Sequence, residues 1–416
     1  MAGLCNDMIK NIVFLVFWPI TAIEEKRWHI EFLRQQGFTV EIYDLTHLLN
    51  SRAIARHPVD GALQEEYIFK IGTYQEFEEM IRSSAPTSIF IDYLVGFSDI
   101  DLKTEKVFRI LKRCNAKYSY LSSGALPLAS GTNTLADKTS LILGKIQKAL
   151  NPQKLGRYIA RKLILLLTRH TSLYPVPYKI FSGNSDILND YCVKHAIDRS
   201  QIVPIHSYDY DTYLYFMRSV NFKLPAQNNT CVFLDEAATY HPDFAILNIK
   251  PVEGEPYFAS MNKLFDKIEQ ETGLRVLIAA HPRSDYERIP DVFNGREIIK
   301  GRTVELVAQS SLTITHASTS INFPILFNKP VIFSKTGEMI KNGFSSLIDA
   351  MAASLGQEAV DIDNLAILGN ISFKHVGINT EKYDEYTYKY IKSKNISELP
   401  VWELVASELK SQSHDK

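Results

Sequence analysis

Two short apolar runs in this chain of 416 residues end abruptly in side chains that can do chemistry. The run 276–280 is followed by His281-Pro282-Arg283, and the run 312–315 is followed by His316 and the hydroxyl cluster Ser318-Thr319-Ser320. Runs of this kind are typical of strands buried on both faces of a parallel sheet. Ligands bind beyond the carboxyl ends of such strands, so the two terminations predict one shared site.

The first termination offers a proton donor and a fixed cation. An unperturbed imidazole changes charge near neutral pH, so His281 could hydrogen-bond a phosphate or help a nucleotide to leave. The alternative is a structural histidine that closes a strand end. Pro282 stiffens the turn, and Arg283 either pairs with phosphate or is a surface side chain beside Asp285.

The second termination indicates an anion site. We expect a helix at 321–327, and the free N–H groups at its start suit a phosphate, although Ser318, Thr319 and Ser320 also serve as ordinary N-caps. His316 either reaches a base or ribose or is a buried, hydrogen-bonded histidine. Glu305 either binds ribose hydroxyls or is a first-turn acid of a helix at 303–309. The cluster predicts a nucleotide-phosphate site.

Length and composition favour a folded protein of two domains. The chain is too long for one core of ordinary size. Hydrophobic residues make up 45% of it and the formal net charge is −1, which argues against disorder and gives no reason to expect a nucleic-acid partner. Four scattered cysteines without metal spacing indicate reduced thiols. The apolar segment 11–20 is too short to span a bilayer, so we expect a cytoplasmic protein without a signal peptide.

Alternating patterns predict two doubly wound, Rossmann-like α/β domains. Strands are expected at 12–18, 38–43, 88–91 and 117–121 in the first half, and at 230–234, 276–280, 297–299, 312–315 and 330–333 in the second. No GxGxxG follows the first strand, so a dinucleotide site is not indicated. We expect a first Rossmann-like domain over 1–210 with a long basic helical insertion, a linker over 211–228, a second Rossmann-like domain over 229–380, and C-terminal helices over 381–416 that pack towards the first domain.

This organisation resembles the GT-B fold of glycosyltransferases, whose two Rossmann-like domains face a cleft. The second half is also similar to bacterial sialyltransferases, polysialyltransferases and capsule-type transferases, which share an acidic pair, a His-Pro pair and a Ser/Thr pair in that order. Here these would be Asp235-Glu236, His281-Pro282 and either Ser318-Thr319 or Thr319-Ser320. The chain departs from those families in having Ala237-Ala238 where they usually place Gly after the acidic pair.

The resemblance implies transfer of a sugar from a nucleotide-sugar, with CMP and UDP both open, to a surface glycan or a lipid-linked acceptor. It makes 1–210 the acceptor-binding domain and 229–380 the nucleotide-sugar-binding domain. Capsule and lipopolysaccharide synthesis are the expected settings. Inverting transfer needs a carboxylate to accept the acceptor's proton. Asp92, Asp235 and Glu236 each follow a predicted strand, and the motif order favours the last two. Ser122-Ser123-Gly124, with Asp92, would line the acceptor site. No metal and no cofactor is expected besides the nucleotide-sugar itself.

A basic stretch over 137–171 carries Lys and Arg beside apolar positions. It is either a solvated helix face or a surface that touches an anionic inner membrane. Two other functions stay open. One is a nucleotide-sugar epimerase or hydrolase of the same architecture, and the other is a non-catalytic, membrane-associated protein of glycan assembly.

Overall fold

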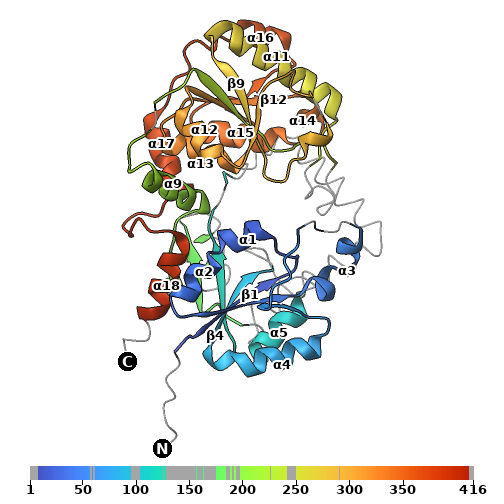
Figure 1. The fold of residues 1–416 in the computed structure, drawn as a ribbon, viewed down its shortest axis with the longest axis vertical. Coiled ribbons are helices and arrows are strands. Elements are labelled where there is room, and N and C mark those ends of the chain that lie inside the picture. The colour runs from blue at the N-terminus through green and yellow to red at the C-terminus, as the bar shows by residue number, and fades with distance from the viewer. Residues whose placement is uncertain are drawn as a thin grey trace, which may run out of the picture. The chain divides into compact units, whose positions relative to one another are not determined.

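A computed structural model of the chain describes residues 8–56, 61–94, 104–124, 175–183, 197–224, 226–240, 250–289 and 291–411, with residues 59, 126, 127, 156, 163, 188, 189, 192 and 193. Most of the basic stretch 137–171 and residues His241, Pro242 and Asp243 lie outside these ranges. The chain divides into two compact units, residues 1–125, 132–208 and 395–416 forming one and residues 126–131 and 209–394 the other. Figure 1 draws the elements of each.

The first unit contains a parallel sheet of seven strands in the order β3-β2-β1-β4-β5-β6-β7. The strands are β1 (Asn11–Val16), β2 (Thr39–Asp44), β3 (Ile68–Lys70), β4 (Ser88–Tyr93), β5 (Lys117–Ser122), β6 (Lys179–Ser182) and β7 (Ile202–Pro204). The strand order reverses between β1 and β4. That reversal is the point at which α/β sheets open a crevice for ligands.

Helices cover both faces of this sheet (Figure 1). They are α1 (Ala22–Arg27), α2 (Ile30–Gln35), α3 (Thr46–Arg56), α4 (Tyr74–Ser84) and α5 (Glu105–Arg113). Alternate residues of β1 divide the core: Phe14 packs with Trp28, while Val13 and Leu15 pack with Phe108 and other side chains of α4 and α5. Helices α1 and α2 are separated at His29, whose backbone is left-handed with φ of 48°.

The last helix of the chain belongs to the first unit. Helix α18 (Val401–Ser411) buries Val401, Trp402 and Val405 in the core that contains Phe14. The Trp402 and Phe14 rings meet edge to face with centroids 5.2 Å apart. The apolar side of helix α18 therefore covers part of one face of the amino-terminal sheet.

The second unit contains a parallel sheet of six strands in the order β10-β9-β8-β11-β12-β13. The strands are β8 (Thr230–Leu234), β9 (Arg275–Ala280), β10 (Ile298–Lys300), β11 (Leu312–Thr315), β12 (Val331–Lys335) and β13 (Val360–Asp361). The helices are α9 (Tyr208–Ser219), α11 (Gly254–Thr272), α12 (Thr303–Gln309), α13 (Asn322–Leu326), α14 (Gly337–Lys341), α15 (Ser345–Ser354), α16 (Leu365–Asn370) and α17 (Thr380–Tyr386). Here the strand order reverses between β8 and β11.

The two sheets confirm the predicted class, two doubly wound parallel α/β domains. Part of the expected linker 211–228 is the helix α9, whose Tyr210, Leu214 and Met217 are buried in the second unit. The helix expected over 321–327 begins earlier, as a 3-10 turn (Thr319–Ile321) that runs into α13.

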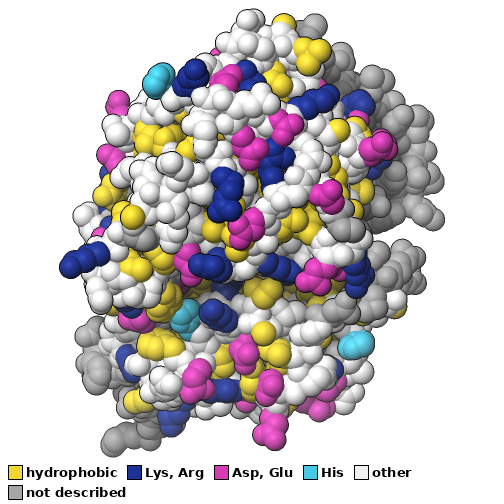
Figure 2. All heavy atoms as spheres, turned by 45° about the horizontal axis from the view of Figure 1, so that its top comes forward, with side chains coloured by type: hydrophobic (Ala, Val, Ile, Leu, Met, Phe, Trp, Pro, Cys, Tyr) yellow, Lys and Arg dark blue, Asp and Glu magenta, His cyan; other side chains and the backbone are white. Residues whose placement is uncertain are grey.

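Acidic and basic side chains are mixed over the face drawn in Figure 2, in keeping with a formal net charge of −1. Within the part of the chain that the structure describes, no helix has both the length and the hydropathy that crossing a bilayer requires.

Candidate functional site

The candidate site lies where three neighbouring strands of the second unit end. Strand β8 lies between β9 and β11, and Leu234 pairs in register with Ala279 while Phe233 pairs with Ile314. The acidic pair Asp235-Glu236 therefore leaves the sheet beside His281 and beside the turn that follows β11. The expectation that these motifs share one edge of one sheet agrees with the strand order.

Asp235 ties the ends of β8 and β9 together. Its carboxylate accepts hydrogen bonds from the Ala237 amide (3.0 Å), the His281 amide (3.0 Å) and the Tyr286 hydroxyl (2.8 Å). Burial raises the pKa of this carboxyl even though the three donors act in the opposite direction. Its oxygens are committed to donors of the protein itself, so Asp235 is a positioning residue that sets the start of the His281 turn.

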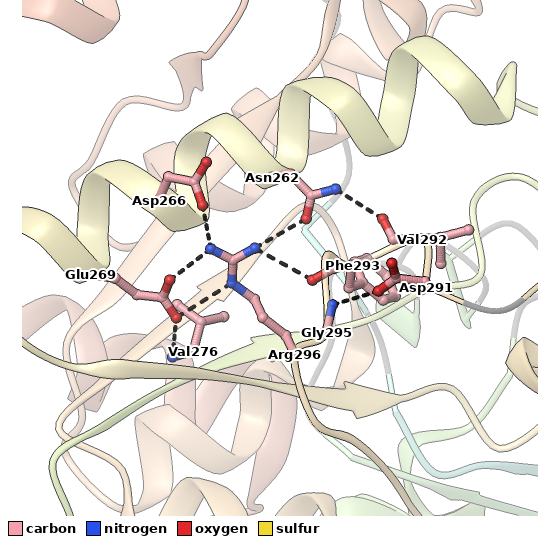
Figure 3. A network of polar contacts seen from close by, with 9 residues as sticks. All are labelled: Asn262, Asp266, Glu269, Val276, Asp291, Val292, Phe293, Gly295 and Arg296. Atoms are coloured by element: carbon pink, nitrogen blue, oxygen red, sulfur yellow. Dashed lines mark hydrogen bonds and ion pairs between the residues drawn. The ribbon is translucent and has the colours of Figure 1, made fainter.

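Tyr286 is supported by a contact with an aromatic ring and, through it, by a network of ion pairs. Its ring packs edge to face on Phe293, with centroids 5.2 Å apart. Three residues after Phe293, the buried guanidinium of Arg296 points to α11, where it contacts Asp266 (2.5 Å) and Glu269 (2.6 Å), as Figure 3 shows. The ionic network thus fixes the loop whose aromatic ring supports Tyr286.

Arg296 also has two oxygen partners that carry no charge. Asn262 Oδ1 lies 3.2 Å from its Nη1, and the carbonyl of Phe293 lies 3.4 Å from the same atom. Glu269 also accepts the Val276 amide at the beginning of β9 (2.9 Å), so one acid joins α11, the loop and the strand.

Glu236 is a second carboxyl of the site whose pKa lies above its ordinary value. It is half-buried, and its Oε1 accepts the Ala317 amide at 2.6 Å, across from the end of β8 to the end of β11. Burial, reinforced by the adjacent Asp235 charge, raises the pKa of Glu236 to about 8, although the Ala317 amide favours the ionised form. A carboxyl that titrates near neutral pH can take up or release a proton under working conditions.

His281 lies half-buried directly after β9, and Pro282 and Arg283 are exposed beyond it. The amide of Arg283 donates to His281 Nδ1 at 3.2 Å, and the amide of Ser284 closes the turn on the His281 carbonyl at 2.8 Å. Because Nδ1 accepts, the neutral ring carries its proton on Nε2. The turn therefore orients His281 as an Nε2–H donor.

His316 is fully buried, and both of its ring nitrogens have partners. Nδ1 lies 2.6 Å from the Ser334 carbonyl and must donate to it, so Nε2 accepts from the Tyr257 hydroxyl at 3.0 Å. Burial lowers the pKa of His316 to about 4, which keeps the ring neutral. The geometry corresponds to the buried, hydrogen-bonded histidine of the two expectations and joins β11, β12 and α11.

The hydroxyl cluster forms a tight turn rather than a bare helix start. Ser318 is buried and its Oγ accepts the Ser320 amide at 3.3 Å, which makes it an N-cap. Thr319 is exposed and Ser320 is half-buried. A donor phosphate at this turn would compete with Glu236 for the Ala317 amide.

The remaining predicted residues lie elsewhere. Glu305, in the first turn of α12, pairs with Arg302 at 2.6 Å, as a first-turn acid does. Asp92 belongs to the first unit, where it is buried and accepts the Leu94 amide (2.6 Å) and the Tyr118 hydroxyl (3.1 Å). Ser122 ends β5, and the Ser123 carbonyl accepts the Tyr208 amide at 3.2 Å.

Sequence reasoning missed the tyrosines that organise the site. Tyr257 comes from the first turn of α11 and Tyr286 from a short turn after β9, and neither stands in a recognisable motif. Their partners are 59 and 51 residues away in the chain, so the pairing arises only from the packed sheet. Among the described residues, no group of three or more His, Cys, Asp or Glu side chains is placed to hold a metal.

The fold is similar to those of solved glycosyltransferases. The wall teichoic acid polymerase TagF matches with a TM-score of 0.51 at 12% identity, over 98% of this chain and 90% of that one. The calicheamicin glycosyltransferase CalG4 matches with a TM-score of 0.51 at 11% identity, over 97% of this chain and 98% of that one. A putative UDP-N-acetylglucosamine 2-epimerase from Listeria monocytogenes reaches a TM-score of 0.44 at 10% identity, over 98% of both chains.

No family model and no curated protein sequence matches the chain. The expected GT-B fold is confirmed by the first two structures together with the two parallel sheets. The narrower resemblance to sialyltransferases, polysialyltransferases and capsule transferases stays a prediction. The chain therefore has the two-domain architecture of GT-B glycosyltransferases.

Proposed function

We propose that this protein is a glycosyltransferase that moves a sugar from a nucleotide-sugar to a glycan or lipid-linked acceptor. The observation that carries the proposal is the convergence of Glu236, His281 and Ser318 on three adjacent strand ends, in a fold that is shared with TagF and CalG4. Crevices at such strand ends are the usual ligand sites of α/β proteins. The nucleotide would be CMP or UDP.

His281 is the proposed partner of the departing nucleotide. Its Nε2–H can donate to a phosphate oxygen, and protonation of the ring adds a positive charge where the leaving group becomes more negative. Arg283, exposed two residues later, supplies a second cation. No step in this proposal requires a metal.

Glu236 is the proposed proton acceptor for the acceptor hydroxyl. Asp92, Asp235 and Glu236 all accept hydrogen bonds from protein donors, and Glu236 is distinguished by its pKa, which burial raises to about 8, near working pH. A base near its own pKa balances the ionised fraction against proton affinity. Its contact with the Ala317 amide also means that donor binding and the state of Glu236 are coupled.

The acceptor would bind to the first unit, near Ser122-Ser123-Gly124. The protein would work in the cytoplasm, and peripheral contact with the membrane is part of the same proposal.

The first test is thermal stabilisation by a panel of CMP-, UDP- and GDP-sugars, because a ligand that binds the folded state raises the melting temperature. Stabilisation by CMP- or UDP-sugars supports the proposal. No shift with any donor would overturn it.

A matched pair of histidine variants tests whether the donor binds beside His281. His281→Ala should depress turnover by more than it weakens donor binding, while His375→Ala, an exposed histidine beside Leu274 and Ser311 at the amino ends of their strands, should change neither. Nucleotide release that needs no acceptor would instead favour a hydrolase or epimerase.

A second N-cap, Asn379, serves as the control that separates the capping role of Ser318 from a role in donor binding. Ser318→Ala and Asn379→Ala each remove an N-cap of the second unit and should each cost about 0.5–2 kcal/mol of stability. Only Ser318→Ala should also weaken donor binding. Unchanged affinity in that variant would leave Ser318 with the capping role alone.

A further inference from the structure

A groove in the first unit gathers positive charge on a molecule that is otherwise close to neutral. Helices α4 and α5 lie side by side on one face of the sheet (Figure 1), and the groove along them has a volume of about 740 Å³. That volume is within the range of small-molecule sites. Its lining includes Tyr74, Glu78, Lys106, Arg109, Lys112 and Arg113.

The cations come from one face of α5. Lys106, Arg109, Lys112 and Arg113 are exposed, while the intervening Val107, Phe108, Ile110 and Leu111 are buried in the core. The groove thus carries four cations and one carboxylate, Glu78. Glu105, which pairs with Arg109, lies outside the lining, so a positive balance remains even when it is counted.

The spacing of the cations suits an extended anion. Residues three apart on a helix are separated by about 4.5 Å along its axis, so Lys106, Arg109 and Lys112 form a row about 9 Å long. A ligand with two or more phosphate groups can contact successive cations of the row.

The carboxylates that already pair with two of these arginines compete only weakly with a bound anion. Arg109 contacts Glu105 at 2.5 Å and Arg113 contacts Glu78 at 2.6 Å, but the two arginine side chains are 50% and 60% exposed. Exposed pairs contribute little to stability, whereas a guanidinium can bind a phosphate through two parallel hydrogen bonds. Lys106 is placed over the Tyr74 ring, 5.0 Å from its centroid, which orients its ammonium at the groove.

We propose that the α4–α5 groove is a second ligand site that binds an anion carrying two or more phosphate groups. The site belongs to the first unit and shares no residue with the proposed donor site, so it does not depend on the proposed function. The phosphates can come from a free oligophosphate or from the headgroup of an anionic phospholipid, because both present the same chemistry to the groove.

The test uses the full-length protein and two probes. Inorganic tripolyphosphate is titrated calorimetrically, and phosphatidylcholine vesicles with and without cardiolipin are used in co-sedimentation. The groove variant Arg109→Gln/Lys112→Gln is compared with Lys263→Gln/Arg275→Gln, which removes one exposed Lys and one exposed Arg from the second unit. Binding should weaken about tenfold or more in the groove variant and stay unchanged in the control.

Binding of tripolyphosphate alone would identify a free ligand, and binding of cardiolipin vesicles alone would identify a headgroup; each supports the site if the groove variant loses it. Failure of both probes to bind, or equal loss in the control variant, would overturn the proposal. So would loss of tripolyphosphate binding in His281→Ala with normal binding in the groove variant. If the double variant melts early, Lys112→Gln alone carries the test, with a smaller loss expected.

Discussion

Glu236 makes stability depend on pH in an unusual direction. Burial raises its pKa from an ordinary 4.5 to about 8, so between these values the folded protein holds a proton that the unfolded chain has released. The unfolding free energy therefore falls as pH rises through this window, by at most about 1.4 kcal/mol per pH unit. Over the whole window the loss approaches about 5 kcal/mol, and at pH 7 it is about 3 kcal/mol.

Glu236→Gln removes this titration and keeps an oxygen that can accept the Ala317 amide. We expect the variant to be more stable than the native protein at pH 7, by up to about 3 kcal/mol, and the difference to grow from pH 5 to pH 8. Urea unfolding at several pH values, followed by tryptophan fluorescence and circular dichroism, measures the difference.

The exposed Glu297, which pairs with Arg275 at 3.4 Å, supplies the control. Glu297→Gln should change stability by no more than about 0.5 kcal/mol. A stability difference between the native protein and Glu236→Gln that stays constant from pH 5 to pH 9 would refute the raised pKa. If Glu236 is also the catalytic base, turnover should rise with pH towards a value near 8 and be lost in the glutamine variant.

Three further substitutions, with one control, test side chains that support the two units. Tyr286→Phe removes a hydroxyl donor from a buried carboxylate and should cost about 1.5–3 kcal/mol, measured by urea unfolding; a cost near zero would show that the Asp235 contact is dispensable. Arg296→Met should lower the unfolding free energy by about 2 kcal/mol, which is less than the loss of a fully buried ion pair would cost, because its partners Asp266 and Glu269 are partly exposed. The control Arg275→Met, which removes an exposed ion pair, should leave the unfolding free energy nearly unchanged. Trp402→Ala should cost about 3–5 kcal/mol, and a much smaller loss would mean that α18 contributes little to the first unit.

The strand pattern was readable from the sequence because each buried strand is a continuous apolar run with a polar end. Strand β8 and helix α12 begin and end where the pattern predicts. The convergence of the acidic pair with His281 and Ser318 was also expected, because carboxyl ends of parallel strands share an edge. Short segments without such a run, such as the two-residue β13, gave no comparable signal.

The roles of individual side chains depended on tertiary packing. Asp235 and Glu236 are adjacent in the chain and follow the same strand, yet one is held by three donors and the other reaches across to the Ala317 amide. Two neighbouring residues of an extended segment point in opposite directions, so their surroundings come from different parts of the fold.

The sequence by itself determined the class of fold and the edge of the sheet on which the motifs meet, because periodicity and strand ends are local properties of the chain. Only the tertiary structure decided which carboxyl is committed to positioning and which titrates near neutral pH. It also placed His316 between Tyr257 and Ser334 and put four cations of α5 along one groove. Hydrogen-bond partners and burial set these properties, and those partners lie tens of residues away in the chain.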